Sequence, residues 1–192
     1  MLKVASVVAA LALLSGAITP AEAGPRFKTL GTDPAGDAPP ALDLTYLKVG
    51  QAALKTDEGL KRAFEIRIGV EGMLPELGGY PDVPGIEWVF KIGDRVFIAE
   101  GVAGRTPRFF LFEMTPDGFE QLESPFGTYD WEDGFIRIVV PLELVGARRG
   151  SVVTGEVVDE LGADGDVDAH LHIGPETYYA DAFKTSGRFV IP

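Results

Sequence analysis

The sequence predicts an all-β protein, a two-sheet antiparallel β-sandwich of jelly-roll-like form with one short helical turn. Two observations support this fold class. The 24 glycines and 14 prolines among the 192 residues divide the chain into short segments, and both residue types mark turns. Between the breaks, apolar and polar residues alternate, which is typical of strands with one buried and one solvated face. Roughly nine to eleven such strands with little helix favour a sandwich over a barrel.

Two segments show the alternation most clearly. In residues 63–70, one face is expected to carry the apolar side chains of Phe64, Ile66, Ile68 and Val70. In residues 86–92, one face is expected to carry those of Ile86, Trp88, Phe90 and Ile92. A period of two places each set on one side of its strand, so both sets are predicted to belong to the core.

Further strands are expected at short intervals. The first strand of the domain is expected at 42–49, and the later ones at 95–102, 108–114, 119–123, 135–140, 152–158, 170–173, 177–180 and 188–191. Gly93-Asp94 and Asp117-Gly118 have the composition of hairpin turns. The expected helical turn runs from Pro141 to Val145, because proline suits the first position of a helix. Residues 24–40 and 72–85 are expected to be irregular.

The N-terminus has the three-part pattern of a secretory signal peptide. Lys3 precedes an apolar run from Val4 to Leu14, and small residues then lead to Ala21-Glu22-Ala23. We therefore expect residues 1–23 to be a signal peptide, residues 24–192 to form a single β-sandwich domain, and the protein to be secreted, extracellular or associated with the cell surface. The apolar run is shorter than the ~20 residues that span a bilayer, so no transmembrane segment is expected in the mature chain.

Composition and charge argue against several function classes. The chain contains no cysteine, so its core must hold without disulfides. Its net charge of −12 argues against binding to nucleic acid, which requires a basic surface. We find no nucleophile elbow and no phosphate-binding glycine loop. Carboxylate pairs such as Glu87 and Glu113 could serve a glycosidase, but an acid-rich chain contains such pairs by chance, and we expect a non-catalytic protein.

Short motifs at both ends of the domain suggest a family. Asp33-Pro34-Ala35-Gly36-Asp37 is followed by Leu42-Asp43-Leu44, residues 138–146 run from a strand into a turn, and Asp181-Ala182 precedes Gly187-Arg188-Phe189-Val190. This arrangement resembles the DOMON-like β-sandwich modules that are related to family 9 carbohydrate-binding modules and occur on secreted prokaryotic proteins. The resemblance implies a jelly-roll-like sandwich, often with a structural calcium ion, that binds sugars or, in some branches, haem.

The calcium ion would bind near the start of the domain. Asp33, Asp37 and Asp43 lie on or beside a loop rich in glycine and proline, and Ca²⁺ takes six to eight oxygen ligands. Gly36 permits a tight path of this loop. In the modules that the sequence resembles, the first and last strands lie close together, which would bring Asp181 to the same site. The alternative is ordinary turn chemistry, since Asp before Pro or Gly favours turns without any metal.

Two histidines are candidates for a different metal site. His170 and His172 lie two positions apart on an expected strand, so both imidazoles should point to one face. Zinc or a similar metal could bind there. The resemblance to DOMON-like modules, some of which bind haem through Met and His, implies a further option, haem between His172 and either Met73 or Met114. The alternative is that both histidines occupy ordinary strand positions.

Sugar binding requires exposed aromatic side chains beside polar groups. The candidates are Tyr80, Tyr129, Trp131, Tyr178 and Tyr179. We therefore expect a secreted, non-catalytic binding module, stabilised by calcium, for carbohydrate or a cell-surface polymer. One alternative is a structural or adhesive extracellular protein that engages other proteins, and a further alternative is a protein with a His-based metal site or haem.

Overall fold

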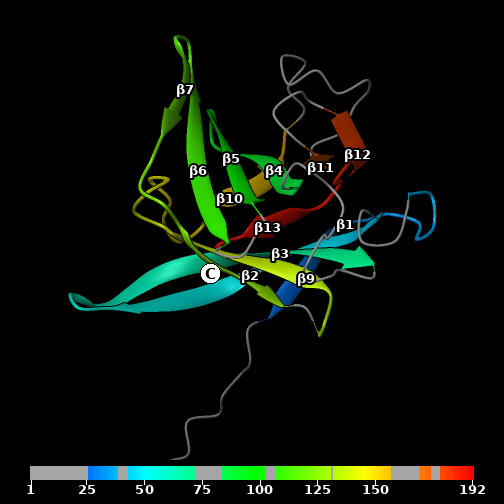
Figure 1. Ribbon diagram of the computed structural model, residues 1–192. Helices are drawn as coiled ribbons and strands as arrows, with labels where there is room; N and C mark the ends of the chain where they lie inside the picture. Colours follow the sequence, from blue (N-terminus) through cyan, green and yellow to red (C-terminus); the bar gives the residue numbers. More distant parts are fainter. Residues whose placement is uncertain are drawn as a thin grey trace, which may run out of the picture.

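The computed structural model describes residues 26–38, 43–71, 84–102, 107–130, 132–156, 169–173 and 178–192. These residues form thirteen strands in two antiparallel sheets, with no helix among them (Figure 1). The β-sandwich that the alternation predicts is therefore confirmed. Within the described ranges, no helix is long and apolar enough to cross a membrane. The expected signal peptide lies outside these ranges.

One sheet contains five strands in the order β1-β2-β3-β9-β8. Its strands are β1 (Phe27–Thr32), β2 (Asp43–Thr56), β3 (Gly59–Glu71), β8 (Phe126–Asp130) and β9 (Phe135–Pro141). The long hairpin of β2 and β3 is paired from Asp43 and Glu71 at one end to Thr56 and Gly59 at the other. Its turn projects beyond the neighbouring strands (Figure 1).

The other sheet contains eight strands, six of them in the order β12-β11-β4-β5-β6-β7. Its strands are β4 (Pro84–Ile92), β5 (Arg95–Val102), β6 (Arg108–Thr115), β7 (Gly118–Gln121), β10 (Val152–Gly155), β11 (Ala169–Ile173), β12 (Tyr178–Phe183) and β13 (Arg188–Val190). β10 pairs with β13 and with the part of β4 that β11 leaves uncovered. Gly93 and Gly118 have φ values of 63° and 120° at the β4–β5 and β6–β7 turns, as expected for the two predicted hairpins.

The inner faces of the two sheets form one hydrophobic core. Phe64, Ile66 and Ile68 of β3 are fully buried, and so are Trp88 and Phe90 of β4. The rings of Phe64 and Phe90 meet edge to face with their centroids 5.8 Å apart, so an aromatic contact crosses between the sheets. Burial of side chains of this size contributes about 1.5–3 kcal/mol each. The alternating positions therefore determine which face of each strand points inward.

Both sides of the sandwich are closed by contacts between the sheets. On one side, the Leu30 carbonyl of β1 accepts hydrogen bonds from the N–H groups of Ser186 and Gly187, each at 2.9 Å. On the other side, the Phe109 ring of β6 lies so close to β8 that a Cβ at Gly127 would be 2.3 Å from the ring. This approach requires glycine, because any side chain would collide with the phenyl group.

Two strands differ from the prediction. The expectation that residues 24–40 are irregular is wrong, because Phe27–Thr32 form β1 and pair with β2. β8 is a second strand that the alternation did not indicate. Both strands contain a glycine, Gly31 or Gly127, and glycine in a strand interior removes the side chain on which such a pattern depends.

The expected helical turn after β9 is present as tight turns rather than as a helix. The Leu144 N–H donates to the Pro141 carbonyl, and the Gly146 N–H donates to the Glu143 carbonyl, both at 3.2 Å. Bonds between residues three positions apart are those of single turns. These turns carry the chain away from β9 and toward β10.

A buried carboxylate lies on the outer face of the five-stranded sheet. Glu65 of β3 is 2 % exposed. Its Oε1 accepts a hydrogen bond from Arg67 Nε at 2.6 Å, and its Oε2 lies 2.8 Å from Arg137 Nη2. The Arg67 guanidinium also lies over the rings of Phe27 and Phe135, with its Cζ 4.1 and 4.7 Å from their centroids. This group therefore joins β1, β3 and β9 by charge and by cation–π contacts.

Replacing Glu65 with glutamine should destabilise the protein, because a neutral amide cannot pair with two guanidinium groups. We expect the free energy of unfolding to fall by about 1–3 kcal/mol, measured by urea denaturation with an unchanged m value. Glu120→Gln in the exposed strand β7 is the matched control and should change stability by less than about 0.5 kcal/mol. Equal effects of the two substitutions would contradict this role of Glu65.

Candidate metal centre

The residues that follow β1 are organised around aspartate side chains. The Asp33 N–H donates to the Thr45 carbonyl at 3.0 Å, which holds the chain beside β2. Gly36 has a φ of 96°, a left-handed conformation that favours glycine, and its N–H donates to Asp43 Oδ2 at 2.5 Å. Asp37 follows in an exposed position. The segment therefore folds back onto the first residue of β2.

Asp181 of β12 reaches this segment from the other sheet. Its Oδ2 accepts a hydrogen bond from the Leu44 N–H of β2 at 2.5 Å, and its Oδ1 accepts one from the Ala182 N–H at 2.8 Å. β2 belongs to the five-stranded sheet and β12 to the eight-stranded sheet (Figure 1). One carboxylate therefore spans the seam between the two layers.

Three aspartates lie within reach of a single cation. Asp33, Asp37 and Asp181 each offer one carboxylate oxygen, and these oxygens lie within 4.8 Å of one another. Ca²⁺–oxygen distances are 2.3–2.6 Å, so oxygens on opposite sides of one ion are about 5 Å apart. Among the side chains that the structure describes, no other group of three or more potential ligands has this arrangement.

Asp43 adds a buried charge beside these three. Its side chain is 0 % exposed, and its charge acts on both Asp33 and Asp181. Asp43 Oδ1 and Asp33 Oδ2 are buried atoms that find no hydrogen-bond donor within the described ranges. A buried ionised carboxylate is costly unless a positive charge compensates it. Asp33, Asp37, Asp43 and Asp181 are called the aspartate cluster below.

The carboxyl groups of the aspartate cluster repel one another. Burial, followed by the charges of Asp181, Asp37 and Asp43, raises the pKa of Asp33 to about 6. Burial also raises the pKa of Asp181, two main-chain N–H groups lower it, and the charges of Asp37 and Asp43 raise it further. A divalent cation would relieve this repulsion, because it reverses the sign of the local field.

Of the four aspartates that the sequence singled out as metal ligands, the structure thus brings Asp33, Asp37 and Asp181 within reach of one ion, and Asp43 adds a charge beside them. The identity of the ion as calcium stays a prediction. The main-chain N–H groups of Gly36, Leu44 and Ala182 hold three of the carboxylate oxygens, and they were not predicted. A main-chain donor has no signature in residue type, so only the folded backbone shows which N–H groups point at a carboxylate.

The two histidines lie on β11. His170 is 1 % exposed, and its Nδ1 lies 3.0 Å from Glu87 Oε1 of β4. It is therefore half of a cross-strand pair between β11 and β4. His172 lies two positions along the same strand, next to a register shift against β12, and only its backbone is described. A zinc or haem site at these histidines stays a prediction.

The aromatic candidates for sugar binding lie in different places. The ring of Tyr129 packs against Phe109 beside the core, with the two centroids 5.8 Å apart. Burial raises the pKa of its hydroxyl, so this ring contributes to packing rather than to an open platform. Tyr178 and Tyr179 lie in β12, where only their backbone is described. Tyr80 and Trp131 lie outside the described ranges.

Comparisons with known proteins find no significant match to this chain among family models, curated proteins or solved structures. The resemblance to DOMON-like modules therefore remains a hypothesis that depends on short motifs. The geometry of the aspartate cluster stands independently of it.

The contribution of Asp33 to the stability of the metal-free protein should decrease as the pH rises from mildly acidic to neutral. An acid whose folded-state pKa exceeds its unfolded value stabilises the protein at low pH, and this contribution disappears as the pH rises through the folded-state pKa. For Asp33, the window extends from 3.8 to about 6. In EDTA, we therefore expect the urea midpoint of the parent to decrease between about pH 4.5 and about pH 7 relative to that of Asp33→Asn.

Asp94→Asn is the matched control, because Asp94 lies in the exposed β4–β5 turn. This variant should keep the pH dependence of the parent. Parallel pH profiles for the parent and Asp33→Asn would show that Asp33 does not experience the repulsion described above.

Proposed function

We propose that this protein is a secreted, non-catalytic binding module, stabilised by calcium, for carbohydrate or a cell-surface polymer. The proposal that calcium stabilises the protein is supported by one observation, the convergence of the aspartate cluster at the seam between the sheets. Its members come from both ends of the domain. Asp181 accepts a hydrogen bond from the N–H of Leu44, the residue after Asp43, across 137 positions of sequence. Chance proximity of turn aspartates does not account for a partner from so distant a strand.

The chemistry of the cluster favours calcium over other divalent cations. All four side chains are carboxylates, which are hard oxygen donors, whereas structural zinc sites use mostly Cys and His. Mg²⁺ retains several waters and is usually held by only one or two carboxylates. Ca²⁺ accepts more oxygen ligands in a more variable geometry, which suits three aspartates that converge on one point.

An ion at this position would join the two sheets. Asp33 and Asp37 follow β1, Asp43 begins β2 and Asp181 lies in β12. In the unfolded chain, Asp181 is far from the other three, so the complete ligand set exists only after folding. Calcium binding would therefore be coupled to folding and would stabilise the folded state by mass action.

A location outside the cell would supply the ion. Extracellular calcium modules bind with dissociation constants of about 10⁻⁴–10⁻³ M, and the N-terminal pattern indicates secretion. The chain has no cysteine, so a bound ion would serve where many secreted domains use a disulfide. The N-terminal pattern and the aspartate cluster therefore both favour a location outside the cell.

The positions of the candidate catalytic carboxylates support a non-catalytic role. Glu87 is paired with His170, and Glu113 receives hydrogen bonds from Arg95 Nε and Nη2, each at 2.6 Å. The hydrogen bond from Arg95 lowers the pKa of Glu113, which is the wrong direction for the general acid of a glycosidase. Binding of carbohydrate is proposed from the resemblance to family 9 carbohydrate-binding modules.

Calcium should raise the melting temperature of the EDTA-treated mature chain. Binding confined to the folded state stabilises by about 2.7 kcal/mol at a hundredfold excess over the dissociation constant, which corresponds to roughly 5–10 °C for a domain of this size. Asp37→Asn should abolish most of this shift, because it removes an exposed ligand. It should not lower the melting temperature in EDTA, since it also removes a repulsive charge.

Asp94→Asn should keep the full calcium shift, and magnesium at equal concentration should produce a smaller one. No shift of the parent at about 100 mM calcium, a hundredfold excess over the weakest expected dissociation constant, would remove calcium from the proposal. A shift that Asp37→Asn and Asp94→Asn retain equally would place the ion elsewhere.

Adhesion to other proteins is a second candidate function, and the β6–β7 hairpin favours it. β7 is the last strand of its sheet and all four of its residues are exposed. Phe119 of β7 is 53 % exposed, and the rings of Phe110 and Phe112 on β6 stack with centroids 6.0 Å apart. The pairing of Phe119 with Met114 places these aromatic residues on one face of the hairpin. An exposed strand edge beside aromatic side chains can pair with a strand of another molecule.

If β7 pairs between copies of the chain, sedimentation velocity should show concentration-dependent association that Phe119→Lys abolishes, because a charge on an edge strand opposes pairing. Phe126→Lys is the matched control, since Phe126 is equally exposed on a different sheet. A monomer at every concentration would count against pairing of copies through β7.

A further inference from the structure

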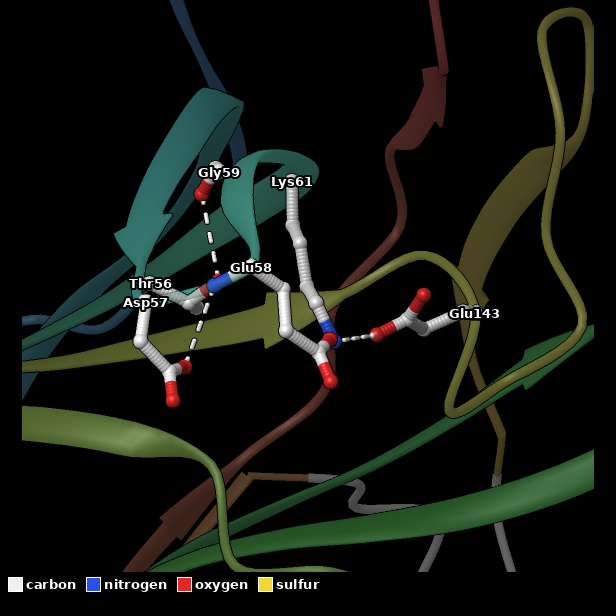
Figure 2. A network of polar contacts seen from close by, with 6 residues as sticks. All are labelled: Thr56, Asp57, Glu58, Gly59, Lys61 and Glu143. Atoms are coloured by element: carbon white, nitrogen blue, oxygen red, sulfur yellow. Dashed lines mark hydrogen bonds and ion pairs between the residues drawn. The ribbon is translucent and has the colours of Figure 1, made fainter.

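A groove lies beside the turn of the β2–β3 hairpin. Its volume is about 460 Å³, within the range of about 300–1,000 Å³ that is typical of ligand pockets. Three segments line it: the end of the hairpin, residues 123–126, and the turn that follows β9. We call it the hairpin groove. Figure 2 shows the hairpin turn facing the turn after β9.

One wall of the hairpin groove is a network of charged side chains. Lys61 Nζ of β3 lies 2.9 Å from Glu58 Oε2 and 2.6 Å from Glu143 Oε1 (Figure 2). The lysine therefore bridges the hairpin and the turn after β9. The side chains of Glu58 and Glu143 are 72 % and 57 % exposed, so they can also accept hydrogen bonds from a ligand. Because Lys61 already orients both carboxylates, less side-chain entropy is lost when a ligand binds.

Another wall carries an aromatic ring that is open to solvent. Phe126 begins β8 and lines the hairpin groove, yet 53 % of it is exposed. Leu54 and Leu144 add apolar surface. A large apolar side chain in a concave position gains free energy when a ligand covers it. An aromatic face beside fixed hydrogen-bonding groups matches a sugar ring, which has an apolar C–H face and a rim of hydroxyl groups.

The charge of the hairpin groove narrows the class of ligand. Its lining contains four carboxylates and two ammonium groups, those of Asp57, Glu58, Glu123, Glu143, Lys55 and Lys61. This excess of negative charge repels acidic ligands such as uronic-acid polymers. It is compatible with neutral sugars and favourable to sugars that carry an amine.

We infer that the hairpin groove is the carbohydrate site of this protein and that it binds saccharides without acidic groups. One sugar ring stacks on Phe126, and its hydroxyl or amino groups bond to the carboxylates that Lys61 orients, Glu58 and Glu143. The inference rests on the proposed function, because it locates and narrows the carbohydrate ligand proposed there. None of these residues is among the aromatic candidates that the sequence indicated.

The test uses the mature chain in calcium. An array of neutral, amine-bearing and uronic-acid oligosaccharides identifies the best-bound sugar, and calorimetric titration then measures its affinity. We expect Phe126→Ala to weaken binding about tenfold or more and Phe126→Tyr to retain it, because tyrosine keeps the aromatic face. Glu143→Gln should weaken binding several-fold. Phe119→Ala is the matched control, since Phe119 is also 53 % exposed but lies outside the groove.

The two proposals fail in different ways. If the folded, calcium-loaded chain binds no saccharide on the array, carbohydrate binding itself is wrong. If saccharide binding survives both Phe126→Ala and Glu143→Gln unchanged, the protein binds carbohydrate at another place and the assignment of the groove is overturned. Selection of uronic-acid sugars would overturn the inferred ligand class. Thermal unfolding verifies that each variant is folded. If Phe126→Ala does not fold, the exposed Glu143→Gln variant alone tests whether the groove is the saccharide site.

Discussion

The two sheets must bury their apolar faces against each other, and this constraint brings the two ends of the domain together. β1 and β2 belong to the five-stranded sheet, whereas β12 and β13 belong to the eight-stranded sheet. Packing of the core therefore places the Leu30 carbonyl within hydrogen-bonding distance of Ser186 and Gly187, and Asp181 within reach of Leu44. The aspartate cluster lies on this seam, so its geometry is a consequence of how the core is packed.

Two carboxylates are buried among the residues that the structure describes, and their charges are compensated in opposite ways. Glu65 is compensated from within the chain, because Arg67 and Arg137 each pair with one of its oxygens. Asp43 is equally buried, but its surroundings add Asp33 and Asp181, and one of its oxygens has no donor in the described part of the chain. Main-chain N–H groups offset only part of this charge. The contrast favours an external cation, since no arginine of the described ranges pairs with Asp43, whereas two pair with Glu65.

The alternation of residues predicts most strands, because a period of two reports directly which side chains face the core. It fails at β1 and β8, where Gly31 and Gly127 allow the rings of Phe183 and Phe109 to approach the backbone, a reason that exists only in the folded chain. Asp33, Asp37 and Asp43 were identifiable from their glycine- and proline-rich loop. Asp181 was predicted as a metal ligand only from the family resemblance. The hairpin groove was not predicted, because three segments that are separate in the sequence form it.

The aspartate cluster and the hairpin groove lie at opposite ends of β2. This strand begins with Asp43 and ends with Thr56, 14 residues in all, and a rise of 3.2–3.4 Å per residue separates its ends by about 40 Å along the strand. The proposed metal ion would be too far away to contact a sugar in the groove, so it would act on binding only through the fold. By joining β12 to the start of β2, it would hold in place the strand whose far end forms one wall of the groove. The acidic residues would then have two roles, one that requires a cation and one in which Lys61 already supplies the positive charge.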